Sequence, residues 1–520
     1  MITGKNYIGR TLSAKGNTTY KTINPESNRE NDPLFFEATE EEISEAVQLA
    51  SMAFETYGQM EGEKKAAFLD AIADEIEALG ETLLNTYVME SGLPMGRANG
   101  ERTRTIGQLR SFSALLRQGS WVGAIISNGQ GKPDIRRIMV PLGPVAVFGA
   151  SNFPFAFSTA GGDTASALAA GCPVVVKSHP LHAGTGELVS SAIIRAAERT
   201  GMPNGVFSNL NSSGISVGKA LVSHPLIKAV GFTGSIKGGT ALCEIAAQRE
   251  VPIPVYAEMG SINPVLVLPS ALKQDKEGWA QKYAASISMG TGQFCTNPGL
   301  ILGIDGKELD GFIDLLEAEI KKIDPSCMLH PSIKAHYEGS KTNVLKAKGV
   351  VAEPQTETLP NYAAPYVLAI SGSEMVADKT FHQEVFGPFS VVVKCDDHQQ
   401  LTAIVNGLEG QLTGTVLAAG LDELELYRDA IQALKGKVGR LLYNNVPTGV
   451  EVSSAMTHGG PFPASSDSKF TSVGSTSIYR WVRPFSYQDW PNDLLPKALQ
   501  DRNPLGIMRT VNDQLTKNAL

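Results

Sequence analysis

The sequence predicts an α/β fold with two parallel-sheet domains in one chain. At 520 residues the chain is longer than one hydrophobic core usually supports, and 42% of it is hydrophobic. Short, continuously apolar runs alternate with helical stretches, which is typical of parallel strands covered on both faces. This alternation begins at Pro144 and begins again after about Ser270. Two successive α/β units are therefore expected.

The first 80 residues predict two amphipathic helices. Thr39 and Glu42 have the spacing of a capping box, in which each residue satisfies a free backbone N–H of the other. Apolar residues then recur at helical intervals over 43–57 and again over 68–79.

From Pro144 onward the apolar runs read as the strands of a first sheet. A helix between two of these strands ends at Gly201, a residue suited to a helix C-terminus. The predicted strands are 145–150, 173–178, 205–210, 228–234 and 254–260.

The second unit starts with a helix through Trp279 to Met289, which leads into Cys295. Two remaining segments, 133–142 and 477–487, resemble edge strands outside either sheet and predict a small separate β layer. The predicted strands of the second sheet are 299–304, 389–395, 411–418 and 439–445.

Composition excludes several functions. A net charge of −8 argues against nucleic acid as a partner. The most apolar region, Ile138 to Ala160, contains Pro141, Pro144 and Pro154, so it predicts no membrane helix. The 5 cysteines are scattered without a CxxC pair, which makes a zinc ribbon or a disulfide framework improbable. The N-terminus lacks the apolar core of a secretory signal. We therefore expect a cytoplasmic protein without membrane, nucleic-acid or metal partners.

Cys295 is the sharpest candidate for chemistry. It lies in "MGTGQFCTNPG", with glycines at 290, 292 and 299 that leave room for substrate and cofactor to approach. A thiolate is a strong nucleophile. The alternative, a small hydrophobe in a tight loop, is the default for a lone cysteine.

Polar residues also follow the predicted strands of the first sheet. Because ligands bind beyond the carboxyl ends of parallel strands, these residues are candidates for a site. Each has an ordinary alternative: a snorkelling lysine, a helix cap or a solvated carboxylate. No GxGxxG fingerprint is present. The candidates are Asn152, Lys177, Ser178, His179, Gly234, Ser235 and Glu258.

Six segments in order resemble the aldehyde dehydrogenase superfamily over nearly the whole chain. They are "ASNFPFAFS", "VVVKS", "GFTGS", "YAEMGSINP", "GQFCTNPG" and "QEVFGPF". The resemblance implies that Cys295 is the nucleophile, that Glu258 is the general base and that Asn152 stabilises the oxyanion. It implies further that the cofactor lies on Lys177 with Ser178 and His179, on Ser235 with Gly234, and on Glu384 and Phe386.

The resemblance also implies a domain division. A Rossmann-like dinucleotide-binding domain would take 1–125 and 142–268, and a second α/β domain over 269–455 would carry the nucleophile. The β layer, 126–141 and 470–495, would join subunits into a homodimer or homotetramer.

Departures from the family pattern point to one branch. Ser151 replaces the usual Trp, "EMGSINP" replaces "ELGGKNP", and "HGGPFPASSDSKFTSVG" replaces the usual C-terminal motif. These variants are similar to α-ketoglutaric semialdehyde (2,5-dioxovalerate) dehydrogenases, which implies 2-oxoglutarate as product. Three alternatives stay open. One is an NADP-dependent dehydrogenase of medium- or long-chain aliphatic aldehydes. Another is a non-catalytic binding protein on the same scaffold. The third is a cysteine acyl-transferase or thioesterase that uses no nicotinamide.

The segment after Lys177 bears on cofactor choice. It contains no carboxylate, and Pro180 stands where family members that favour NAD often carry Glu. Since such an acid repels a 2′-phosphate, the sequence predicts NADP, with NAD as the alternative. A keto-acid substrate also needs a cation for its carboxylate, and Arg102, Arg104 and Arg110 are candidates. Their ordinary alternative is a solvated helix face.

Overall fold

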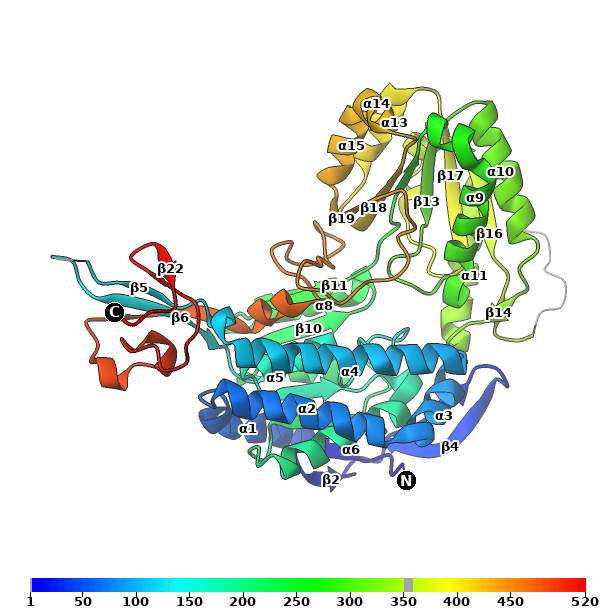
Figure 1. The fold of residues 1–520 in the computed structure, drawn as a ribbon. Coiled ribbons are helices and arrows are strands. Elements are labelled where there is room, and N and C mark those ends of the chain that lie inside the picture. The colour runs from blue at the N-terminus through cyan, green and yellow to red at the C-terminus, as the bar shows by residue number, and fades with distance from the viewer. Residues whose placement is uncertain (1, 130, 350–358) are drawn as a thin grey trace.

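The computed structural model describes residues 2–129, 131–349 and 359–520. Within these ranges two large sheets with flanking helices form the body, and a third sheet projects to one side (Figure 1). The α/β fold class predicted from the sequence is confirmed.

The first sheet contains all five strands predicted from 145 onward. They form its parallel part, in the order β11-β10-β7-β8-β9, and two short strands, β1 and β2, extend it antiparallel. The sequence did not predict β1 and β2 because three residues are too few to show alternation. The strands are β11 (Val255–Glu258), β10 (Ala229–Thr233), β7 (Val145–Phe148), β8 (Val174–Lys177), β9 (Phe207–Leu210), β1 (Asn6–Ile8) and β2 (Thr11–Ser13).

Helices cover both faces of this sheet, which explains the continuously apolar strands. Val145 and Val147 face the core under α2–α6, whereas Ala146 and Phe148 face the core under α1, α7 and α8. The predicted capping box starts α1, since Thr39 and Glu42 each bond the other's backbone N–H. The helices are α1 (Glu40–Tyr57), α2 (Gly62–Ala78), α3 (Gly80–Ser91), α4 (Met95–Gln118), α5 (Gly162–Ala170), α6 (Ala183–Arg199), α7 (Ser216–Ser223) and α8 (Ile236–Ala247).

The second sheet has six strands, and all its pairs are parallel, in the order β16-β17-β13-β12-β18-β19. The sequence predicted four of them and missed β12 and β16. β12 lies within 142–268, the range predicted for the first domain, although it pairs with β13 and β18. The strands are β16 (Tyr366–Ser371), β17 (Phe389–Cys395), β13 (Leu300–Ile304), β12 (Val265–Val267), β18 (Gln411–Leu417) and β19 (Val438–Tyr443).

Helices α9 and α10 pack on one face of the second sheet, and α11, α12, α13 and α15 pack on the other. The short helix α14 adjoins α15. The helices are α9 (Pro269–Ser288), α10 (Lys307–Ile320), α11 (Pro331–Ala347), α12 (Gly372–Ala377), α13 (His398–Gly407), α14 (Leu421–Leu426) and α15 (Arg428–Lys435).

The third sheet projects from the body at the left of Figure 1. The two predicted edge segments pair antiparallel as β6 and β20, and the sheet continues through β5, β21 and β22. Within the second segment, Ser475–Trp481 forms a 3₁₀ helix rather than a strand, because Trp481 is buried and donates its indole N–H to Ser166. The strands are β5 (Ile125–Ser127), β6 (Ile135–Pro141), β20 (Val482–Gln488), β21 (Arg509–Val511) and β22 (Gln514–Thr516).

Two small strand pairs complete the described chain. They are β3 (Thr19–Asn24) with β4 (Arg29–Phe36), and β14 (Ser326–Cys327) with β15 (Tyr362–Ala363). No helix of the described residues is long and apolar enough to cross a membrane.

Loops that follow strands of the first sheet contact loops of the second sheet, as where Asn152, after β7, bonds the carbonyl of Gln293, before β13. The first sheet turns its carboxyl ends toward the loops that precede β13 and β17 of the second sheet. The segment that follows β19 returns to the first sheet, where Ser465 bridges Glu258 and Ser466 bonds the backbone N–H of Ala257. This returning segment carries residues between 444 and 474 into the junction.

Candidate active site

The loop that carries Cys295 begins with an unusual backbone geometry. Gly290, Thr291 and Gly292 all have left-handed φ values, near +55°, +56° and +63°. A Cβ on Gly292 would lie 2.2 Å from the carbonyl of Gly387, so only glycine fits there. The close approach of Gly387 is thus one reason for glycine at 292, and Gly292 also lines a small cavity.

Asn263 fixes the loop to the second sheet. Its amide donates to the carbonyl of Cys295 at 2.8 Å and to that of Asn297 at 2.9 Å. Its own carbonyl oxygen accepts from Thr413 on β18. Asn263, which "EMGSINP" shares with the usual "ELGGKNP", thus orients the cysteine loop.

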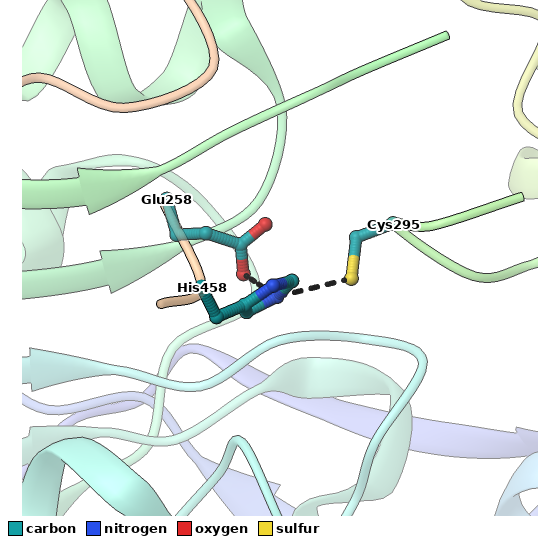
Figure 2. Close-up of side chains that lie close together, drawn as sticks. All are labelled: Glu258, Cys295 and His458. Carbon is teal, nitrogen blue, oxygen red and sulfur yellow. Dashed lines mark hydrogen bonds and ion pairs between the residues drawn. The ribbon is translucent and has the colours of Figure 1, made fainter. Parts of the chain in front are cut away.

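Cys295, His458 and Glu258 lie together (Figure 2). The Cys295 Sγ and one carboxylate oxygen of Glu258 each lie 3.4 Å from the Nε2 atom of His458. His458 and Glu258 are almost fully buried, with side chains 1% and 3% exposed. One imidazole nitrogen therefore stands between the predicted nucleophile and the predicted base.

The surroundings keep this thiol protonated. Desolvation, followed by the negative charges of Glu258 and Glu384, raises the pKa of Cys295 well above its usual value. Arg104 and Arg440 oppose this shift but do not cancel it. A neighbouring proton acceptor is therefore required for thiolate formation, and His458 is in position to be one.

Cys295 also faces a cavity of about 500 Å³, a size ordinary for a small-molecule site. Helix α4 supplies one wall, with Arg97 and Arg104, and the loop at Gly449 and Val450 supplies another. Phe153, Phe157, Phe294, Leu93 and Met289 make much of the remaining lining apolar. The sulfur is therefore reachable from a mainly apolar cavity.

Asn152 is buried at the same junction. Its amide donates to the carbonyl of Gln293 at 3.0 Å, two residues before Cys295. Its own backbone carbonyl accepts from Arg97 at 3.3 Å. The second N–H of the amide has no partner among the described residues and can serve another acceptor.

Comparison with known proteins gives this arrangement a family. The model of the "Aldehyde dehydrogenase family" matches residues 12–465. The chain belongs to the aldehyde dehydrogenase family. It is therefore an enzyme that oxidises aldehydes.

Two bacterial relatives align over almost their whole length. The aldehyde dehydrogenase described here is 46% identical over 517 residues to alpha-ketoglutaric semialdehyde dehydrogenase 2 of Azospirillum brasilense, covering 98% of each chain. It is 44% identical over 524 residues to alpha-ketoglutaric semialdehyde dehydrogenase of Acinetobacter baylyi, covering 99% of each.

Solved structures share the fold at low identity. A mutant 1-pyrroline-5-carboxylate dehydrogenase of Thermus thermophilus superposes with a TM-score of 0.81 at 21% identity, covering 93% of this chain and 92% of that one. Betaine aldehyde dehydrogenase of Staphylococcus aureus, solved with NAD⁺, has the same TM-score and identity over 94% and 96%. These matches establish the fold of this aldehyde dehydrogenase.

In this aldehyde dehydrogenase five of the residues predicted to bind the dinucleotide lie at the carboxyl ends of β8 and β10: Lys177, Ser178, His179, Gly234 and Ser235. Lys177 ends β8, and Ser235 follows β10 and caps α8, where its hydroxyl accepts from Gly238 N at 3.1 Å. Gly234 and Ser235 are exposed. Phosphate oxygens can therefore reach this helix N-terminus.

The charge of Lys177 is disfavoured by desolvation and is not neutralised by a neighbour in the described ranges. Desolvation lowers its pKa to about 8, and its ammonium group makes no hydrogen bond or ion pair with the residues that the structure describes. Ser178 is buried with its hydroxyl unpartnered in the same part of the chain. His179 instead caps the next turn through Leu181 and stacks on His182.

Glu384 and Phe386 lie on the other side of Cys295. Both line a small cavity with Gly292 and Phe294. Desolvation raises the pKa of Glu384 to about 7, and the charge of Glu258 adds to this shift. An acid of this kind, beside a space lined by polar backbone, suits hydroxyl groups of a ribose.

Sequence reasoning missed two residues of the site. The one signal for His458 was its position in "HGGPFPASSDSKFTSVG", the C-terminal segment that differs from the family pattern. Residue patterns alone do not connect this segment to Cys295. Arg97 stacks between Phe153 and Phe294 with its guanidinium carbon 4.5 Å from each ring centre. Of the predicted arginines only Arg104 reaches the cavity.

The other two predicted arginines bond elsewhere. Arg110 pairs with Asp74 and Glu77 on the surface. Arg102 bonds Asn99 on its own helix. Both faces of α4 carry arginines, so the sequence could not separate them.

Proposed function

We propose that this aldehyde dehydrogenase oxidises 2,5-dioxovalerate, also called α-ketoglutaric semialdehyde, to 2-oxoglutarate. Its two full-length relatives carry that activity in their names, at 46% and 44% identity. The observation that carries the proposal is the Cys295 thiol on a cavity wall, with His458 and Glu258 behind it.

The first step is activation of the nucleophile. His458 Nε2 accepts the thiol proton across the 3.4 Å contact, which leaves a thiolate beside an imidazolium. The Glu258 carboxylate, equally close to Nε2, stabilises the positive charge as it forms. A thiol with a raised pKa thereby becomes reactive at neutral pH.

The thiolate then attacks the aldehyde carbon and forms a thiohemiacetal. The free N–H of the Asn152 amide and the backbone N–H of Cys295 stabilise the oxyanion, an effect commonly worth about 3 kcal/mol per donor. A nicotinamide bound beside Glu384 and Phe386 would supply the oxidant, taking hydride from the thiohemiacetal carbon as the oxyanion re-forms a C=O bond. Cys295 is left as a thioester of the acid.

Glu258 serves the second half of the reaction. Its carboxylate is buried and has only His458 within ion-pair range among the described residues, so it is free to take a proton from water. The activated water hydrolyses the thioester and releases the acid. Glu258 therefore acts twice, first by charge and then as a base.

The residues at the sheet edge fit a nicotinamide dinucleotide. We infer that Lys177, with Ser178 and His179, adjoins the adenosine ribose, that Gly234 and Ser235 hold the pyrophosphate, and that Glu384 and Phe386 adjoin the nicotinamide end. The unpartnered Lys177 and the exposed helix N-terminus at Ser235 support this assignment.

We further infer that NADP is accepted. The segment after Lys177 has no carboxylate, which leaves room for a 2′-phosphate. One acid from elsewhere opposes this: Glu37, after β4, lies in electrostatic range of Lys177. Its carboxylate is bonded to Ser213 and Ser216, which weakens its repulsion of a phosphate.

The third sheet supports a subunit contact. β20 is its outer strand, with one edge unpaired among the described residues, and Phe485 and Trp490 are 39% and 50% exposed there. We propose that this edge joins subunits in a homodimer or homotetramer.

All 5 cysteines are free, which favours a reducing, cytoplasmic setting.

A second candidate substrate is a medium- or long-chain aliphatic aldehyde. The apolar lining of the cavity, with Phe153, Phe157 and Phe294, favours it. Arg104 on the same wall favours an anionic substrate instead. A non-catalytic binding protein has no need of the buried Cys295–His458–Glu258 contact.

A panel of aldehydes tests the proposal. Absorbance of reduced nicotinamide is followed with 2,5-dioxovalerate, succinic semialdehyde, glutaraldehyde and alkanals, each with NADP and with NAD. We expect the highest kcat/KM with 2,5-dioxovalerate and measurable turnover with NADP. A clear preference for alkanals would overturn the substrate, and turnover with NAD alone would overturn the cofactor.

The same assay separates thiol chemistry from a metal site. Ligand atoms of Glu258, Cys295 and His458 lie within 4.8 Å of one another, a spacing that also suits a bound ion. We expect activity to survive dialysis against a chelator. Loss of activity that an added divalent metal restores would contradict the assigned roles.

A further inference from the structure

We propose that Arg104 binds the substrate's carboxylate and so selects short aldehydes that carry an acid at the far end. This inference rests on the proposed function and names the residue that recognises its substrate class. Arg104 lines the same cavity as Cys295, from helix α4.

The cavity contains two arginines, but one of them is already neutralised. Arg97 pairs with Glu101 at 3.5 Å, donates to the Asn152 carbonyl and stacks between two phenylalanines. Arg97 is therefore fully engaged by the protein. It shapes the wall and holds Asn152.

Arg104 has no such compensation. It forms no ion pair with any residue in the described ranges, and its Nη1 is buried without a hydrogen-bond partner. Its Nη2 donates only to the Val450 carbonyl, at 3.2 Å, and its guanidinium carbon lies 5.1 Å from the ring centre of Phe157. Desolvation lowers the pKa of this arginine, which reflects the cost of holding its charge here.

Nearby acids do not supply the missing charge. Both oxygens of Glu101 are in use: one accepts from the backbone of residues 155 and 156, and the other accepts from Tyr87 and faces Arg97. Glu451 is exposed, and it acts on Arg104 only through space. A partly buried cation left unpaired destabilises a protein, so an anionic ligand here recovers part of that energy.

The chemistry of the ligand follows from the two ends of the cavity. The aldehyde carbon must reach Cys295, and the anion must reach Arg104, with apolar walls between them. A planar guanidinium binds a carboxylate through two parallel hydrogen bonds. The ligand is therefore a short, unbranched oxo acid with its aldehyde and carboxylate at opposite ends.

A pair of matched substrates tests the inference. Arg104→Met and Arg104→Lys are compared with Arg110→Gln, which removes a surface arginine from the same helix. For each variant, kcat/KM is measured with 2,5-dioxovalerate, with succinic semialdehyde and with pentanal, which has five carbons and no charge.

For Arg104→Met we expect the ratio of kcat/KM for either acid to kcat/KM for pentanal to fall about 10- to 100-fold. A smaller loss common to all three substrates should accompany it, because Arg104 also lowers the pKa of the Cys295 thiol. Arg104→Lys should recover part of the loss, and Arg110→Gln should leave kcat/KM unchanged for the acids and for pentanal. The retained oxidation of pentanal shows that the variant is folded.

Two results overturn the inference. Equal losses with acids and pentanal would make Arg104 structural, and unchanged use of both acids would place the carboxylate elsewhere. The proposed function fails separately, if the unmodified enzyme oxidises 2,5-dioxovalerate poorly. In that case the ratio of kcat/KM for succinic semialdehyde to kcat/KM for pentanal, compared between the unmodified enzyme and Arg104→Met, still decides the role of Arg104.

Discussion

The two sides of Cys295 carry opposite charge. Toward the first sheet and the loop before β17 lie the carboxylates of Glu258 and Glu384, which raise the pKa of the thiol. Toward helix α4 lies the uncompensated guanidinium of Arg104, which lowers it. The sulfur sits where an acidic region and a basic region meet.

This difference separates the two ligands of the reaction. The acidic side suits the oxidised nicotinamide, whose ring is cationic, and also the base that activates water. The basic side suits a carboxylate at the far end of the aldehyde. Because desolvation and the two carboxylates together raise the pKa of the thiol more than the arginines lower it, activation of the thiol falls to His458.

The largest effect is expected from removing the sulfur. Cys295→Ala leaves both charged sides in place but deletes the only nucleophile in our mechanism, so aldehyde oxidation should drop to background. Dinucleotide binding, measured by calorimetry, should be retained. Turnover by this variant above a buffer control would rule out Cys295 as the nucleophile.

Next in size is the loss of the proton acceptor. His458→Asn should lower kcat/KM about 10²- to 10⁴-fold at pH 7. Without the imidazole, the rate follows the thiolate fraction of a thiol whose pKa is well above normal, so kcat/KM should rise about tenfold per pH unit between pH 7 and 9. A variant with the pH profile and rate of the unmodified enzyme would remove His458 from the mechanism.

A smaller effect, on the affinity for NAD, is expected when pH changes the charge of Glu384 on the acidic side of Cys295. The pKa of Glu384 is about 7, so this carboxyl is mostly neutral at pH 6 and mostly ionised at pH 8. The ionised form attracts the nicotinamide cation and accepts hydrogen bonds from ribose, so the Kd for NAD should fall up to about tenfold over that range. Lys177, with a pKa of about 8, loses charge at the upper end and acts in the opposite direction.

Calorimetry with NAD, which lacks the titrating 2′-phosphate, provides the measurement. Glu384→Gln should bind NAD with an affinity that varies little between pH 6 and 7.5. If this variant keeps the full pH dependence, another group causes it.

The smallest effect concerns the far end of the cofactor. Glu37→Gln removes a carboxylate in electrostatic range of Lys177, which should raise the NADP-to-NAD ratio of kcat/KM by about threefold. Glu30→Gln, on the exposed strand β4, is the matched control and should leave the ratio unchanged. A ratio that stays constant in Glu37→Gln would show that Glu37 does not face the 2′ position.

Sequence patterns were most informative where local rules decide. The strand at 145–148 is apolar throughout because both of its faces are covered. Thr39 caps a helix because it and Glu42 each bond the other's backbone N–H. Strands of three residues, such as β1 and β12, carry too little pattern to be found.

The candidate site was predictable only as far as the family motifs extend. Lys177, Ser235 and Glu258 follow parallel strands, so their common edge could be expected. His458 reaches Glu258 across a return of the chain from the second sheet, and no residue spacing encodes that contact. Arg104 differs from Arg102 and Arg110 only in the direction it faces from α4.

The most direct test of the account is the capture of its covalent intermediate. Glu258→Gln is mixed with 2,5-dioxovalerate and NADP, quenched in acid, digested and analysed by mass spectrometry. We expect a burst of reduced cofactor equal to the enzyme concentration and an acyl group on the peptide that contains Cys295. An acyl group on another cysteine, or a burst without any acylated peptide, would contradict the assignment of Cys295 as nucleophile and Glu258 as the base that releases the product.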